Sequence, residues 1–143
     1  MKKNLSILVV DDSETDRYLL KRLIQKTELI EFIYEVENGQ EALDHLEKML
    51  LNSNDEQEVR FPNIIFLDVN MPLLNGFEFL QKYLDFTQEN KQFPISNIIM
   101  FSSSENEEDR KKALAYDFVN DYMIKGSAGT KEIKNKIEDI FKL

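Results

Sequence analysis

Short apolar runs recur along the chain, and each is nearly continuous rather than alternating with polar residues. Such runs are typical of strands in a parallel sheet that helices cover on both faces. A further segment, residues 31–37, alternates more and carries more charge, which predicts a strand nearer an edge of the sheet. The four continuous runs are Leu5–Val10, Ile64–Leu67, 98–101 and 122–124.

Between these runs lie segments in which apolar residues recur at helical spacing. Two of them begin with a capping pattern, in which Ser13 or Ser104 precedes an acidic residue by three positions. Strand and helix thus alternate five times, which predicts an α/β fold with right-handed crossovers and a parallel sheet between helices. The polar stretch 52–61 has no period and is expected to be a surface loop. The helical segments are 13–26, 40–51, 76–86, 104–116 and 131–141.

Length and charge narrow the classes of function. The 143 residues fit one ordinary domain. With 27 acidic and 18 basic residues, the formal net charge of −9 disfavours binding to nucleic acid or to an anionic membrane. The absence of cysteine excludes disulfides, zinc–thiolate sites and cysteine nucleophiles. No apolar run approaches the roughly 20 residues needed to span a bilayer, so a cytoplasmic protein is expected.

A polar side chain follows each of the four continuous apolar runs. The carboxyl ends of parallel strands meet at one edge of the sheet, where open α/β sheets bind their ligands. We therefore expect these side chains to lie together at that edge. The residues are Asp11, Asp12, Asp68, Ser102 and Lys125.

The chemistry of this set favours phosphoryl transfer. Three neighbouring carboxylates repel one another, and a hard divalent cation such as Mg²⁺ removes that conflict. An ammonium and a hydroxyl would then stabilise the oxygens of a transferring phosphoryl group, with one aspartate as the nucleophile. Taken singly, an aspartate after a strand is more often a helix cap or a turn residue. The joint pattern is what favours a site.

These residues lie in motifs that resemble the receiver domain of two-component response regulators. The resemblance covers essentially the whole chain, so residues 1–143 are expected to form a receiver domain without an output domain. It implies a flavodoxin-like, doubly wound parallel sheet of five strands in the order 2-1-3-4-5, with five helices. The matching segments are 7–12, 64–72 followed by Gly76, 98–103 and 121–125.

The resemblance also implies a role for each matching acidic position. Asp68 would be the phosphoacceptor. Asp12 and Asp68 would bind Mg²⁺ directly, Asp11 would act through water, and the backbone carbonyl of Asn70 would add a ligand.

The remaining matching positions would respond to phosphorylation. Ser102 would bind the phosphoryl group, and Lys125 would pair with Asp68 or with the phosphoryl oxygens. Tyr122 would be an aromatic switch that turns inward when Ser102 moves.

Three features depart from the family pattern. Ser102 stands where Thr is common, and the hydroxyl is retained. Gly126 follows Lys125 where the family usually has Pro, and a non-proline cis bond costs about 2.5–4 kcal/mol, so a trans peptide is expected there. The loop 52–61 is longer than in minimal receivers. It resembles the subgroup of stand-alone receivers that partner phytochrome-type kinases.

The expected function is a single-domain response regulator rather than an enzyme. A sensor histidine kinase or a histidine phosphotransfer protein would donate the phosphoryl group. The signal would leave by contact with a downstream protein, by onward phosphotransfer or through a phosphorylation-dependent homodimer. One alternative is a Mg²⁺-dependent phosphatase of the haloacid-dehalogenase type, although that family has an Asp where this chain has Asn70. A second is a flavodoxin-like binding module, whose flavin phosphate Asp11 and Asp12 would repel.

Overall fold

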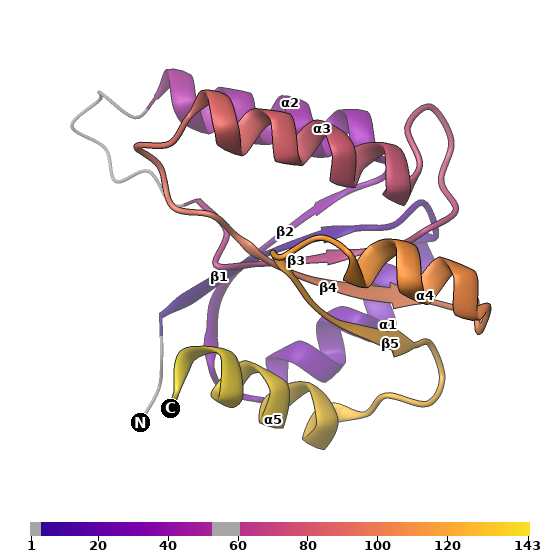
Figure 1. The fold of residues 1–143 in the computed structure, drawn as a ribbon. Helices are drawn as coiled ribbons and strands as arrows, with labels where there is room; N and C mark the ends of the chain where they lie inside the picture. Colours follow the sequence, from indigo (N-terminus) through magenta and orange to yellow (C-terminus); the bar gives the residue numbers. More distant parts are fainter. Residues whose placement is uncertain (1–3, 53–60) are drawn as a thin grey trace.

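The computed structural model describes residues 4–52 and 61–143 (Figure 1). Residues 53–60, and with them most of the expected loop at 52–61, lie outside this part of the chain. The strands are β1 (Leu5–Val10), β2 (Ile30–Val36), β3 (Ile64–Leu67), β4 (Asn97–Ser102) and β5 (Val119–Ile124). The helices are α1 (Glu14–Gln25), α2 (Gly39–Leu51), α3 (Gly76–Glu89), α4 (Glu107–Leu114) and α5 (Thr130–Phe141).

The five strands form one sheet in the order β2-β1-β3-β4-β5, and every neighbouring pair is parallel. This confirms the expected flavodoxin-like topology. The continuous apolar runs form the central strands, and all four residues of β3 are buried. The alternating segment forms β2, which lies at an edge of the sheet as its pattern predicts.

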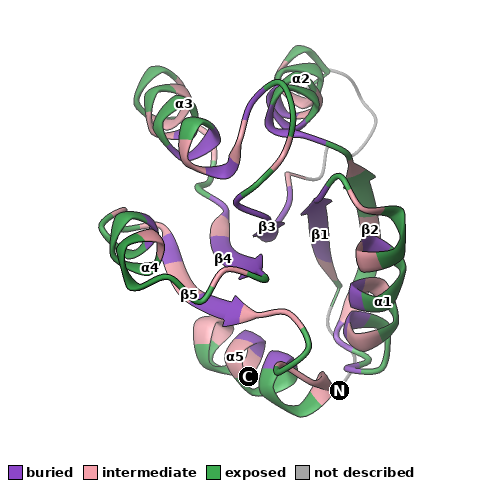
Figure 2. Ribbon diagram, turned by 90° about the vertical axis from the view of Figure 1, so that its right-hand side faces the viewer, coloured by how far each residue is buried: buried purple, intermediate pink, exposed green. Residues whose placement is uncertain are grey.

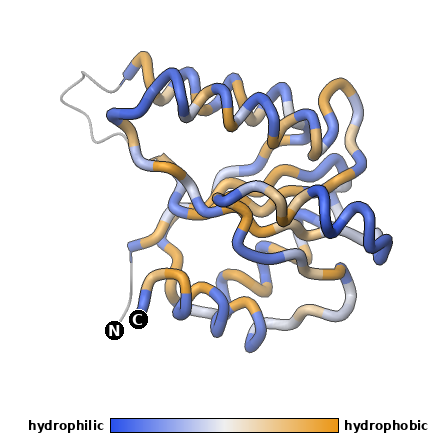
Figure 3. The backbone as a smooth tube through the Cα atoms, viewed as in Figure 1, coloured by the Kyte–Doolittle hydropathy of each residue, from blue (hydrophilic) through white to orange (hydrophobic). Residues whose placement is uncertain are grey.

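Helices cover both faces of the sheet and divide the core into two layers (Figure 1). Because side chains alternate along a strand, Ile7 and Val9 of β1 pack with α1 and α5, whereas Leu8 and Val10 pack with the other three helices. Figure 2 shows the buried residues on the strands other than β2 and on the inner sides of the helices. In Figure 3 the strands are largely hydrophobic, and α4 is the most uniformly hydrophilic helix. Only Ala113 of α4 is buried.

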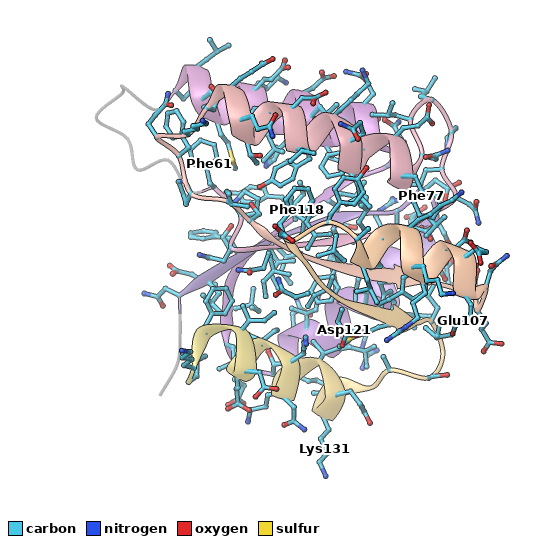
Figure 4. The ribbon with its side chains drawn as sticks, in the orientation of Figure 1. Phe61, Phe77, Glu107, Phe118, Asp121 and Lys131 are labelled. Atoms are coloured by element: carbon cyan, nitrogen blue, oxygen red, sulfur yellow. The ribbon has the colours of Figure 1, made fainter. Side chains whose placement is uncertain are left out.

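The start of α4 corrects one expectation. The predicted cap was Ser104, but the helix begins at Glu107 (Figure 4) and its N-cap is Asn106, whose side chain accepts a hydrogen bond from the Glu108 N–H at 2.8 Å. The Ser104 hydroxyl instead donates to Asp109 at 2.7 Å. Ser104 therefore lies in the turn before the helix, and its hydroxyl bonds to a side chain in the first turn of α4 instead of capping it.

The start of β5 was also predicted too late. The strand begins at Val119, three residues before the expected run 122–124, because Asn120 and Asp121 interrupt the apolar pattern. β5 is the second edge of the sheet, where polar side chains can remain solvated while the backbone pairs. Asn120 also donates a side-chain hydrogen bond to Asn97 of β4 at 2.9 Å.

Replacing Gly76 with alanine is expected to destabilise the fold by about 1–3 kcal/mol through overpacking. Gly76 is the first residue of α3, and a Cβ there would collide with the backbone carbonyl of Asp68 and crowd Val69. Urea unfolding followed by circular dichroism measures the loss. Gly129→Ala, at the N-cap of α5, is the control, because its Cβ would meet only the flexible end of Glu132. Equal stability of the two variants would contradict the steric argument.

Candidate functional site

Four strands deliver the predicted polar side chains to one edge of the sheet. β1 ends just before the two aspartates, β3 ends just before the third, β4 ends on the serine and β5 ends just before the lysine. The structure therefore brings together residues that are up to 114 positions apart in a chain of 143 residues. They are Asp11, Asp12, Asp68, Ser102 and Lys125.

Asp11, Asp12 and Asp68, here called the acidic cluster, each offer a carboxylate oxygen, and these oxygens lie within 4.8 Å of one another. Asp11 and Asp68 are buried, whereas Asp12 is exposed. Three carboxylates with no histidine or cysteine are a donor set that suits a hard divalent cation such as Mg²⁺. The acidic cluster therefore fits the expected metal by the chemistry of its donors.

Lys125 lies against the acidic cluster and partly neutralises it. Its ammonium nitrogen is 2.6 Å from a carboxylate oxygen of Asp11, 2.9 Å from one of Asp16 and 3.3 Å from one of Asp68. Burial alone would lower the pKa of Lys125, but its hydrogen bonds to Asp11 and Asp16 raise that pKa above the ordinary value. The lysine therefore stays charged at neutral pH.

The carboxyl group of Asp68 is the most strongly perturbed acid of the site. Burial, followed by repulsion from Asp11, raises its pKa from 3.8 to about 6, although Lys125 and the Val69 N–H act in the opposite direction. The Val69 N–H donates to Asp68 Oδ1 at 2.8 Å, which leaves Oδ2 with the longer contact to Lys125. With a pKa of about 6, the carboxyl group of Asp68 is still mostly ionised at neutral pH.

Ser104 connects Ser102 with Tyr122. Ser102 is fully buried, and its Oγ accepts a hydrogen bond from the Ser104 N–H at 3.1 Å. The Tyr122 hydroxyl donates to the carbonyl of Ser104 at 2.9 Å, and the residue is only 5% exposed. Ser104 therefore contacts Ser102 through its backbone N–H and Tyr122 through its carbonyl oxygen. The switch itself stays a prediction.

Two further expectations concern the loops around the site. Asn70 is exposed in the loop after β3, and the role of its carbonyl as a ligand stays a prediction. The Lys125–Gly126 peptide is trans, because no cis bond occurs among residues 4–52 and 61–143. Gly126 has a φ of 85°, a left-handed conformation that favours glycine.

The sequence reasoning missed two residues of the first helical turn. Asp16 binds Lys125, and Arg17 donates from Nη1 to the carbonyl of Asp11 at 2.8 Å while pairing with Glu35 of β2. Arg17 is buried, so it ties α1 and β2 to the loop that carries the first two aspartates. The sequence did contain one indication of this contact. The capping pattern at Ser13 places the first turn of α1 directly after the loop that carries Asp11 and Asp12.

A parallel sheet in this strand order, with the acidic cluster and Lys125 at its carboxyl edge, has the arrangement expected of a signalling receiver domain, and comparison with known families agrees. The family model of the response regulator receiver domain matches residues 7–138. The chain therefore belongs to the response regulator receiver domain family of two-component signalling. The phosphatase alternative is not favoured.

The chain is also similar to solved structures and to curated proteins. A two-component response regulator from Cytophaga hutchinsonii superposes with a TM-score of 0.83 at 28% identity, over 99% of this chain and 100% of that one. The bacteriophytochrome response regulator RtBRR gives a TM-score of 0.71 at 30% identity, over 98% and 78% of the two chains. A protein-glutamate methylesterase/protein-glutamine glutaminase of Burkholderia thailandensis is 32% identical over 94% of this chain and 35% of its own length. The chain spans about a third of the length of the curated relatives it matches.

Among the described residues, none of the helices is both long enough and apolar enough to cross a bilayer.

Proposed function

We propose that the carboxylate of Asp68 accepts a phosphoryl group from a histidine kinase or a histidine phosphotransfer protein in a Mg²⁺-dependent reaction. The observation that carries this proposal is the position of the Asp68 carboxylate. Asp68 belongs to the acidic cluster, and its Oδ2 lies 3.3 Å from the Lys125 ammonium. The domain would act as a phosphoacceptor switch rather than as a turnover enzyme.

Asp68 is favoured over the other two carboxylates as the acceptor. In both Asp11 and Asp68, Oδ1 accepts a hydrogen bond from a backbone N–H. Oδ2 of Asp11 lies 2.6 Å from the Lys125 ammonium, whereas Oδ2 of Asp68 lies 3.3 Å from it and is therefore less tightly held. Asp12 is exposed, and therefore less shielded from water than Asp68. An acyl phosphate on Asp68 would form in the more protected position.

The transfer step forms one bond to phosphorus and breaks another. The Asp68 Oδ2–phosphorus bond forms as the phosphorus–nitrogen bond of the donor phosphohistidine breaks, and the imidazole keeps the electron pair and takes up a proton. Mg²⁺ held by the acidic cluster would supply positive charge to the phosphoryl oxygens. Lys125 would donate to one of those oxygens, and the Ser102 hydroxyl would leave the Ser104 N–H to donate to another.

Intact-mass measurement with a small phosphodonor tests this function. The wild-type protein with Mg²⁺ and acetyl phosphate is expected to gain the mass of one phosphoryl group. Asp68→Asn should gain none, and neither should the wild type in EDTA. Mass is the suitable readout because the chain has no tryptophan to report by fluorescence. No gain in the wild type, or an undiminished gain in Asp68→Asn, would refute the proposal.

The name of one structural neighbour supports a particular donor. RtBRR is described as a bacteriophytochrome response regulator and is 30% identical to this chain. A phytochrome-type histidine kinase is therefore the first donor to test. Onward transfer or contact with a downstream protein, alone or through a phosphorylation-dependent homodimer, would then carry the signal.

A further inference from the structure

Asp16 contacts the phosphoacceptor site through the ammonium of Lys125. An ammonium group has three N–H donors, and the three carboxylates around Lys125 can accept one each. Asp16 Oδ2 lies 2.9 Å from the nitrogen, nearer than Asp68 Oδ2 at 3.3 Å. Asp16 is nevertheless not one of the carboxylates that form the acidic cluster.

The first turn of α1 holds Asp16 in place. Its backbone N–H donates to the Ser13 hydroxyl at 3.2 Å, which fixes the turn at its N-cap. A carboxylate in this turn is also stabilised by the positive end of the helix dipole. The side chain of Asp16 is 38% exposed, against 5% for Asp11 and 9% for Asp68. It therefore lies at the outer side of the ammonium, towards solvent.

A cation in the acidic cluster would compete with the lysine. It would bind carboxylate oxygens of Asp11 and Asp68, which now pair with Lys125, and it would repel the ammonium. The lysine side chain is only 15% exposed, so an ammonium without an anionic partner would be costly at this depth. Asp16 is the remaining acceptor within reach that the cation does not need.

We propose that Asp16 is a positioning residue, which keeps the Lys125 ammonium paired beside the acidic cluster while a divalent cation occupies that cluster. The proposal rests on the proposed function, because it assumes the Mg²⁺ site of the phosphoacceptor. Its consequence is that Asp16 strengthens Mg²⁺ binding without contacting the metal, by giving the displaced lysine a partner.

Calorimetric titration with Mg²⁺ alone, at neutral pH and constant ionic strength, tests this role. Asp16→Asn keeps the shape of the side chain and removes its charge, and it is expected to weaken Mg²⁺ binding about five-fold, the scale of one ion pair. Glu14→Gln is the matched control, because Glu14 is exposed in the same turn. Its effect should stay below about two-fold. Equal losses in both variants would overturn the proposal.

A double-mutant cycle separates an effect through Lys125 from direct attraction of the metal by Asp16. In a Lys125→Met background, Asp16→Asn should no longer change the Mg²⁺ affinity, and an undiminished loss there would overturn the proposal. If Lys125→Met does not fold, ¹⁵N spectra of the lysine ammonium groups replace it. The Lys125 signal should persist in Mg²⁺-saturated wild type and disappear in Asp16→Asn, and identical spectra would count against the role.

The titration also separates this proposal from the function on which it rests. A wild type that binds no Mg²⁺ overturns both. A wild type that binds Mg²⁺ but gains no phosphoryl mass overturns the function alone, and the affinities still decide the role of Asp16.

Discussion

Replacing Lys125 by methionine is expected to lower the free energy of unfolding of the metal-free protein by about 3–5 kcal/mol near pH 7.5, the range for breaking a buried ion pair. The ammonium is the shared partner of Asp11 and Asp68, whose side chains are only 5% and 9% exposed. Methionine fills similar space but leaves both carboxylates without their cation. Urea unfolding in EDTA, followed by circular dichroism, measures the difference.

The loss should shrink when Mg²⁺ is added, because the metal can replace the missing positive charge in the acidic cluster. Lys131→Met is the control. Lys131 is exposed in the first turn of α5 and extends away from the ribbon in Figure 4, so its removal should change stability by less than about 0.5 kcal/mol. A Lys125 variant as stable as the Lys131 variant would show that the ion pairs contribute nothing net.

The strands and the edge that carries the site could be predicted from the sequence for one physical reason. Strands covered on both faces are nearly continuously apolar, as β1 is apart from Ser6 and β3 is throughout. The polar residue that follows each of these runs marks the functional edge. Asp68 and Lys125 were placed by this reasoning, although they lie 57 positions apart. At these positions the local sequence pattern is consistent with the strand that the fold requires.

The contact between Asp16 and Lys125 could not be predicted in the same way. It joins residues 109 positions apart and depends on how α1 lies against the loop after β5. Helical periodicity identifies the buried face of α1 but does not say which loop its first turn will meet. The prediction of the start of α4 was wrong for a different reason. Ser104 and Asn106 are both suitable N-cap residues, but the Ser104 hydroxyl donates to Asp109, and Asn106 is the N-cap.

The charge of Asp68 is expected to cost the metal-free protein stability above pH 6. Its pKa is raised from 3.8 to about 6 in the folded protein, because burial and Asp11 disfavour the ionised form. The protonated form is therefore favoured by folding: its stabilising contribution is complete below the unfolded pKa and is lost as the pH rises through about 6. Asp68→Asn, which cannot ionise, should raise the free energy of unfolding by ~1–3 kcal/mol at pH 8 in EDTA and change it little at pH 4.

Urea unfolding at a series of pH values from 4 to 8 tests this expectation, with Asp117→Asn as an exposed control that should follow the wild type. Mg²⁺ should stabilise the wild type more than Asp68→Asn, because the metal neutralises a charge that the variant lacks. Asp68→Asn should therefore have opposite effects on function and on stability. It should remove the phosphoacceptor and stabilise the metal-free fold. An Asp68→Asn protein that is less stable than the wild type at pH 8 would mean that the contact with Lys125 outweighs burial and the repulsion from Asp11.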